Sequence, residues 1–320
     1  MDRPRVIFAY REGHRSSGAK IMRVDQLSAM AQSHLGDRWE FRSLALPRPG
    51  QRKHQRAMIE DVSGAVVIFL KRAIDVVDLD IQWEWRDAVR ALAIDYVDAE
   101  TLPWPKIPID VHIAASGALE RHLLAQLKTH PELARGANAR VMRLDHHADP
   151  SLEGFWPDRP RDELRLFYFG RTKNRTLPGS LANRVVHPDY GGLGIEDELR
   201  GVLATSNMHY GVREMPPPDQ RRAFKPFTKG FTAAACGAHI LVNRQADDAE
   251  AFLGADYPFL IDDCSEDAIA GGIDLARSMV GTPQWTDTLA AMEDIRANIG
   301  PRKIMSQLDA VLTAISGRPD

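Results

Sequence analysis

Short apolar runs alternate with helical patterns of apolar and polar residues along the whole chain. The runs are rich in Val and Ile at consecutive positions, which is typical of strands in a parallel sheet covered on both faces. Between the runs, apolar residues recur every three to five positions, as at Ile21, Val24 and Leu27, and this spacing indicates one face of a helix. The first block of predicted strands covers 5–10, 65–70, 92–97, 109–115 and 139–144.

A second block of the same kind follows a break at 145–162. That segment is rich in Pro, Asp and Gly and lacks apolar periodicity, so it predicts a linker. Two consecutive blocks of similar size predict an α/β fold with two doubly wound, Rossmann-like domains. The predicted strands of the second block are 164–169, 184–187, 207–212, 238–243 and 258–262, with helices near 196–203, 229–236, 247–253, 266–279 and 286–299.

The last segment predicts one further helix, at 302–316. Pro301 stands at its entrance and Gly317 beyond its end. Its apolar face has no place in the second sheet, which is already complete, so we expect this helix to pack on the first domain. The predicted organisation is therefore a domain at 1–150, a domain at 151–300, and a crossing helix within 301–320.

Composition and charge exclude some function classes. Hydrophobic residues make up 44% and charged residues 27% of the 320, with a formal net charge of -3. This near-balance gives no overall positive field, so we expect no nucleic-acid partner. The N-terminus starts a strand rather than an apolar signal segment, and no apolar run approaches the ~20 residues of a membrane span. We expect a cytoplasmic protein with at most peripheral membrane contact.

The segment 225–237, KPFTKGFTAAACG, carries the most informative chemistry. Thr228 is a plausible N-cap, so a helix should begin near Lys229 with its free N–H groups and positive dipole end exposed. Such an end binds phosphate, and the charges of Lys225 and Lys229 would add to it. The alternative is a capped helix whose lysines are merely solvated.

The same segment resembles the nucleotide-sugar motif of the retaining "group 1" glycosyltransferases, written E-P-F-G-x-x-x-E-A-M-A-C-G-x-P-V-V. Here it reads KPFT, then TAAACG, then a strand, with the spacing kept. Lys225 stands in place of the first acid, which in the family lies beside the donor sugar. Thr232 stands in place of the second acid, which usually holds the ribose.

Two further segments resemble the family in the same order. FYFGRTK, at 167–173, is similar to the strand-Gly-Arg opening of the second domain, and the resemblance implies that Arg171 contacts the donor diphosphate. A lysine usually follows that arginine, and Lys173 and Arg175 are the nearest candidates. Ahead of it, HHAD and FWP, within 146–157, resemble the family's linker motif N-G-V-D…F-x-P.

The resemblance implies a GT-B fold, in which two Rossmann-like domains face each other across a cleft. It also implies transfer of a sugar from a nucleotide-diphosphate donor, held by the second domain, to a glycan or small-molecule acceptor on the first, as in bacterial-type polysaccharide synthesis. Such enzymes stabilise the leaving diphosphate with cations and helix ends. We therefore expect no metal and no cofactor apart from the nucleotide sugar as co-substrate. Asp78 and Asp80 fit a solvated helix edge better than a metal site.

The loop after the first strand, REGHRSSG at 11–18, supplies candidates in the first domain. Ser17 and Gly18 open a helix and could approach the donor phosphates or the acceptor, although an ordinary turn capped by Ser17 explains them equally well. An inverting reaction would need a base, and the candidates are Glu12, His14 and His112, which we place at the end of a strand. The loop lacks the G-x-G-x-x-G pattern of NAD sites.

Two other functions stay open. A GT-B epimerase or hydrolase would bind the same donor and release nucleoside diphosphate without an acceptor. A catalytically silent binding subunit is suggested by the change at both acidic positions of the motif.

Overall fold

The computed structural model describes residues 3–14, 17–131, 139–155, 157, 162–188, 197–217, 220–221 and 223–316. The chain divides into two compact units. Unit 1 comprises Met1–His146, Arg222–Pro226 and Pro301–Asp320, and unit 2 comprises His147–Arg221 and Phe227–Gly300. The sequence pattern places the boundary near 150 and gives no sign of the short segment Arg222–Pro226.

Unit 1 contains a six-stranded parallel sheet in the order β2-β1-β3-β4-β5-β6. The apolar runs predicted all of these strands except β2, whose sequence EFRSLAL is only partly buried. A strand at the edge of a sheet exposes one side to water, so its apolar run is broken. The strands are β1 (Arg5–Arg11), β2 (Glu40–Leu46), β3 (Val66–Leu70), β4 (Ala91–Asp95), β5 (Val111–Ala114) and β6 (Arg140–Arg143).

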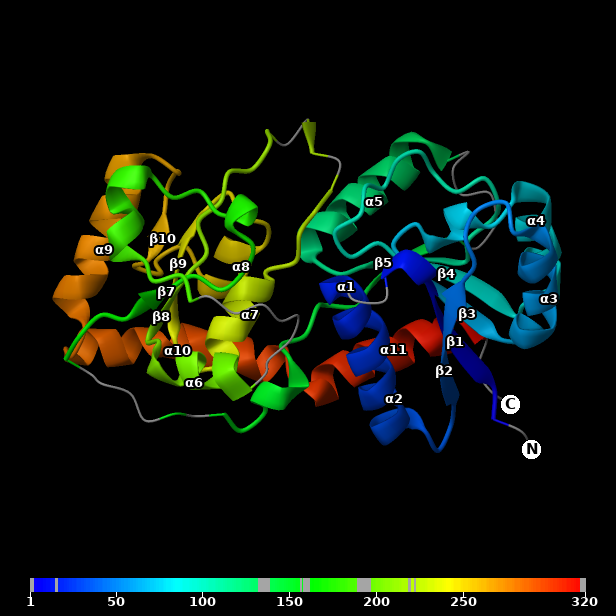
Figure 1. Cartoon of the computed structure of the whole chain (residues 1–320), viewed down its shortest axis with the longest axis horizontal. Coiled ribbons are helices and arrows are strands. Elements are labelled where there is room, and N and C mark those ends of the chain that lie inside the picture. The colour runs from blue at the N-terminus through cyan, green and yellow to red at the C-terminus, as the bar shows by residue number, and fades with distance from the viewer. Residues whose placement is uncertain are drawn as a thin grey trace. The chain divides into compact units, whose positions relative to one another are not determined.

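Helices cover both faces of this sheet. Val6 and Phe8 of β1 lie in one apolar cluster and Ile7 and Ala9 in another, as the two-residue period of a strand requires. The final helix belongs to the first cluster, where it packs against α2 and β3; Figure 1 shows it in red beside the blue α2. The helices are α1 (Gly18–Lys20), α2 (Leu27–Leu35), α3 (Arg52–Val62), α4 (Leu79–Ala88), α5 (Gly117–Thr129) and α11 (Pro301–Ser316).

Unit 2 contains a parallel sheet in the order β10-β9-β8-β7. The strand predicted at 184–187 is wrong: only Val186 pairs, through a bridge to Phe167, and Gly179–Arg184 is a 3-10 helix. Pro188 follows closely and lacks the N–H group that would extend the ladder. The strands are β7 (Leu166–Phe167), β8 (Met208–Tyr210), β9 (His239–Asn243) and β10 (Leu260–Ile261).

Most helices of unit 2 pack around one large apolar cluster, whereas Leu199 and Leu203 belong to a smaller one. Phe231 of α7 and Met292 of α10 both belong to it, and these two helices contact each other. All five helices lie where the sequence predicts them, with ends that differ by a few residues. They are α6 (Asp197–Thr205), α7 (Thr228–Ala235), α8 (Ala249–Leu253), α9 (Glu266–Met279) and α10 (Pro283–Asn298). In the described part of the chain, no helix is long and apolar enough to span a bilayer.

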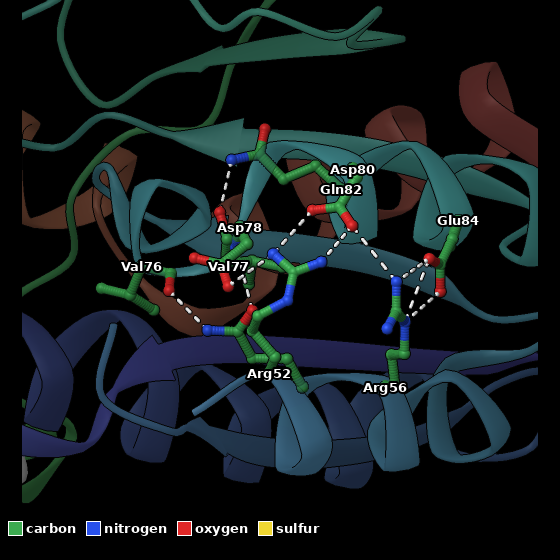
Figure 2. Close-up of polar contacts among 9 residues, drawn as sticks. Arg52, Arg56, Val76, Val77, Asp78, Asp80, Gln82 and Glu84 are labelled. Atoms are coloured by element: carbon green, nitrogen blue, oxygen red, sulfur yellow. Dashed lines mark hydrogen bonds and ion pairs between the residues drawn. The ribbon is translucent and has the colours of Figure 1, made fainter. Parts of the chain in front are cut away.

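An exposed set of ion pairs joins α3 to α4 (Figure 2). Arg52 contacts Asp78 at 3.1 Å and also bonds to Asp80, while Arg56 reaches Glu84 at 2.8 Å. The Asp80 side chain is 51% exposed. The prediction that this acidic segment is a solvated helix edge is therefore confirmed.

Candidate functional site

The turn that follows the carboxyl end of β7 carries several cationic residues. The chain leaves β7 through Phe169 and Gly170, and it then forms the short 3-10 helix Thr172–Asn174. Gly170 has a φ of +143°. The backbone conformation favours glycine, and a Cβ there would lie 2.8 Å from Nζ of Lys229, so another residue would displace the lysine side chain.

Helix α7 begins directly beside this turn, one residue earlier than the sequence predicts. Its N-cap is Phe227, which offers no side-chain hydrogen bond, and the prediction that Thr228 is the cap is wrong. The packing of Phe227 explains where the helix starts. Its ring is buried and stacks on the Phe252 ring, with ring centres 6.1 Å apart. Gly230 makes room for that ring, because a Cβ there would lie only 2.0 Å from it. Thr228 is therefore the first residue of the helix.

Lys229 joins α7 to the turn. Its ammonium group donates a hydrogen bond to the Phe169 carbonyl oxygen at 2.8 Å and lies 4.1 Å from the centre of the Tyr168 ring. The guanidinium carbon of Arg175 lies 5.2 Å from the centre of the same ring. The turn and the helix start thus bring two cations to one aromatic side chain.

Three cations of the turn have no ion pair among the described residues. Arg171 and Lys173 are exposed, while Arg175 is half-buried. The Nη1 atom of Arg175 is buried and has no hydrogen-bond partner in the described part of the chain. The sequence reasoning considered Arg175 only as a stand-in for the lysine of the family motif; its cation–π contact was not visible from spacing.

Lys225 and Thr232, which stand in place of the two acids of the motif, lie in different surroundings. Lys225 belongs to the segment grouped with unit 1, where the adjacent Phe224 is buried against His122, with ring centres 4.7 Å apart. Thr232 lies one turn into α7 and donates its hydroxyl to the Thr228 carbonyl oxygen at 3.0 Å. Its oxygen lone pairs remain available to accept a hydrogen bond.

The loop after β1 lies where a parallel sheet reverses its winding. β2 lies on one side of β1 and β3 on the other, so the carboxyl ends of β1 and β3 flank a topological switch point. Glu12, Gly13 and His14 form a 3-10 helix there. Arg15, Ser16 and the side chain of His14 lie outside the described residues, as does Trp156 of the linker motif.

Ser17 caps the helix that follows, as one reading of the sequence predicts. Its hydroxyl accepts a hydrogen bond from the Lys20 backbone N–H at 3.3 Å, and the exposed Gly18 is the first residue of α1. This bond accounts for the conformation of both residues without a ligand.

His112 lies inside the core of unit 1 rather than at a strand end. It occupies the second position of β5, is 2% exposed, and its Nδ1 lies 2.9 Å from the Tyr96 hydroxyl. Burial lowers the pKa of His112 to about 4. A buried neutral imidazole bonded to Tyr96 favours a structural role over that of a base for an acceptor.

A buried ion pair at the carboxyl edge of unit 1 was missed by the sequence reasoning. Arg23 lies in the π-helical segment Ile21–Gln26 between α1 and α2, and its Nε donates to Asp95 at 2.7 Å. Arg23 also donates to the carbonyl oxygens of Leu144 and Asp145, which ties three parts of the edge together. Burial raises the pKa of Asp95, and the charge of Arg23 opposes this shift.

Comparison with known proteins finds similar solved structures. No protein-family profile and no curated protein matches the chain. A glycosyltransferase from Rickettsia africae ESF-5 superposes over 100% of both chains with a TM-score of 0.64 at 11% identity. AviGT4, a glycosyltransferase involved in avilamycin A biosynthesis, gives 0.54 at 12% identity, with 98% of each chain covered.

A third similar structure is the DNA-modifying enzyme β-glucosyltransferase, studied in the presence and absence of uridine diphosphoglucose. It gives a TM-score of 0.51 at 13% identity, and the match covers 97% of this chain and 99% of that one. With their parallel sheets and helix-covered faces, the two units therefore have the Rossmann-like α/β architecture of GT-B glycosyltransferases. The fold class expected from the sequence is confirmed.

Proposed function

We propose that this protein is a glycosyltransferase that moves a sugar from a nucleotide-diphosphate donor to a glycan or small-molecule acceptor. The observation that carries the proposal is the set of cations beside the start of α7. Arg171, Lys173 and Arg175 have no ion pair in the described part of the chain, and Lys229 lies in the first turn of the helix. The GT-B fold supports the same conclusion.

These groups suit a nucleoside diphosphate. The N-terminal end of a helix carries a partial positive charge, and arginine and lysine form strong hydrogen bonds with phosphate oxygens. In glycosyl transfer, the bond between the anomeric carbon and the diphosphate oxygen breaks while the acceptor oxygen attacks that carbon. Negative charge grows on the departing diphosphate, and nearby cations stabilise it in the transition state. Thr232 is a candidate hydrogen-bond donor or acceptor for the ribose.

The proton of the attacking acceptor hydroxyl must also be removed during the reaction. In an inverting reaction, a base of unit 1 would remove it, and Glu12 and His14 remain the candidates because they follow β1 at the switch point. In a retaining reaction, the departing diphosphate oxygen could take the proton. Product analysis of the anomeric configuration separates these two routes.

The experiment is to mix the full chain with a panel of nucleotide sugars, with and without acceptors. Calorimetry would measure binding, and nucleoside diphosphate release would measure turnover. The proposal expects release that depends on an acceptor. Release without an acceptor would favour an epimerase or hydrolase, and binding without release would favour a silent binding subunit. No binding to any nucleoside diphosphate or nucleotide sugar would contradict all three.

Donor binding should also proceed without a divalent ion, because the proposed ligands of the diphosphate are cations. Hard divalent ions prefer carboxylate and other oxygen ligands. Affinity for UDP should therefore be unchanged by a chelator. A loss of affinity that magnesium or manganese restores would contradict this part of the proposal.

A further inference from the structure

We propose that the ring of Tyr168 holds Lys229 and Arg175 in place for the diphosphate, which makes Tyr168 a positioning residue of the donor site. This inference rests on the proposed function. It starts from the burial of Tyr168, which is 0% exposed although the exposed Arg171 follows it closely in the chain. A buried aromatic ring cannot itself meet a substrate, so any effect on binding must pass through its neighbours.

Two cations lie over this one ring, and Lys229 is also held by its hydrogen bond to the Phe169 carbonyl oxygen. Lys229 Nζ lies 4.1 Å from the ring centre, and Arg175 Cζ lies 5.2 Å from it, both within the distance at which a cation is attracted to an aromatic face. Both side chains are long and have many rotamers. A ring that restricts them before a ligand arrives reduces the entropy that binding must overcome.

The hydroxyl of Tyr168 fixes a third part of the site. It donates a hydrogen bond to the Arg171 carbonyl oxygen at 2.7 Å, which anchors the backbone of the turn. Gly170 leaves the space between the elements open, because a Cβ there would lie 3.2 Å from the Tyr168 hydroxyl oxygen as well as 2.8 Å from Lys229 Nζ. One side chain therefore contacts the turn through its hydroxyl and two cations through its ring.

The neighbouring buried tyrosine provides a natural contrast. Tyr210 lies with its ring centre 6.4 Å from that of Tyr168, and its hydroxyl bonds to the Thr176 carbonyl oxygen. In the described part of the chain, no cation lies over the Tyr210 ring. Tyr210 therefore shares burial and a hydroxyl bond with Tyr168 but lacks the cation–π contacts.

The test changes the electrostatics of the ring while keeping its shape. Tyr168 is replaced by Phe, and then by phenylalanines carrying increasing numbers of ring fluorines, which withdraw charge from the aromatic face. Calorimetry measures the binding of UDP and of inorganic pyrophosphate at two salt concentrations. We expect stepwise weakening with fluorination, about threefold to tenfold over the series, since each step loosens the two cations.

Two controls accompany the series. Tyr210→Phe removes a buried hydroxyl from the same sheet and should leave affinity unchanged. Fluorinated phenylalanine at Phe259, a fully buried ring with aromatic neighbours, tests whether fluorination by itself affects binding. Equal affinity across the Tyr168 series, in proteins that bind UDP, would overturn the inference and leave the proposed function intact. Failure of the wild-type chain to bind UDP, pyrophosphate and every other nucleoside diphosphate would instead overturn the proposed function.

Discussion

The carboxyl edge of the unit 1 sheet and the turn after β7 in unit 2 both carry cations, and they differ in how those cations are paired. In unit 1, Arg23 pairs with Asp95 at 2.7 Å, Arg72 with Asp75 at 2.7 Å, and Lys71 with Asp98 at 2.6 Å. In unit 2, the turn after β7 carries three cations that have no ion pair among the described residues. Neutralised cations hold loops in place, whereas cations without carboxylates retain the field that attracts a polyanion. This difference supports our proposal that unit 2 binds the diphosphate.

The largest expected effect concerns the paired edge. Arg23→Met should lower the free energy of unfolding by about 3–5 kcal/mol, because it leaves the Asp95 carboxylate buried without its partner. Arg38→Met is the matched control, since Arg38 pairs with Asp309 at 2.8 Å on the surface, and such pairs contribute about 0–1 kcal/mol. Chemical denaturation measures both. Equal losses in the two variants would show that the buried pair has no special structural role.

The pH dependence of stability should be similar in the two units, because each contains a buried histidine whose pKa is lowered to about 4. Burial lowers the pKa of His112 and of His239 to about 4, whereas an unfolded histidine titrates near 6.5. The unfolded chain then binds more protons between these values, so stability falls as the pH drops from about 6.5 to about 4. Each histidine should account for up to about 3 kcal/mol of this loss.

Denaturation at several pH values checks this prediction. His112→Gln should remove the part of the pH dependence of stability that comes from unit 1. His239→Gln should remove the part that comes from unit 2. A wild-type profile that is flat between pH 7 and pH 4 would show that neither imidazole is held neutral.

The difference between the paired cations of unit 1 and the cations of the turn after β7 is tested most simply by removing one cation from each unit. Arg175→Ala should weaken UDP binding about tenfold to a hundredfold, because a charged contact to phosphate contributes about 1.5–3 kcal/mol. Arg72→Ala, which removes a paired cation from unit 1, should leave the affinity unchanged. Calorimetric titration of both variants decides the matter. A larger loss from Arg72→Ala than from Arg175→Ala would reverse the assignment of the two units.

The smallest effect is expected at the surface pairs between α3 and α4. The hydrogen bond from Arg52, together with its charge, holds the pKa of Asp80 below its ordinary value of 3.8. A carboxylate with a lowered pKa contributes stability above that value and loses it as the pH falls through the folded pKa. Asp80→Asn should therefore be slightly less stable than wild type at pH 7, and the difference should vanish in strong acid. Thermal melts at both pH values measure it, and a difference that grows in acid would contradict the sign.

The sequence predicted the fold well because burial on two faces leaves a clear signal. Strands such as β3, VVIFL, are apolar at every position. The spacing of Val24 and Leu27 predicts the helical stretch that the π-helical segment and α2 form together. The edge strand β2 was missed because half-exposed positions interrupt its pattern. The segment 184–187 was misassigned because apolar residues alone do not show that Pro188 ends the pairing.

The geometry of the candidate site could be predicted less completely, since it depends on contacts between distant segments. The motif at 225–237 located the start of α7, and the Gly-Arg pair located the turn after β7. Spacing could not show that Phe227, rather than Thr228, precedes the first turn of the helix, because ring packing against Phe252 decides it. The contacts of Tyr168 could not be predicted either, since Arg175 and Lys229 approach its ring from segments far apart in the chain.

The position of bound nucleotide tests the central claim most directly. A crystal structure of the full chain with UDP should show the diphosphate against the first turn of α7, in contact with Lys229 and with Arg171 or Arg175. Diphosphate bound at the carboxyl edge of unit 1, or in unit 2 without contact to any of these three side chains, would contradict the account.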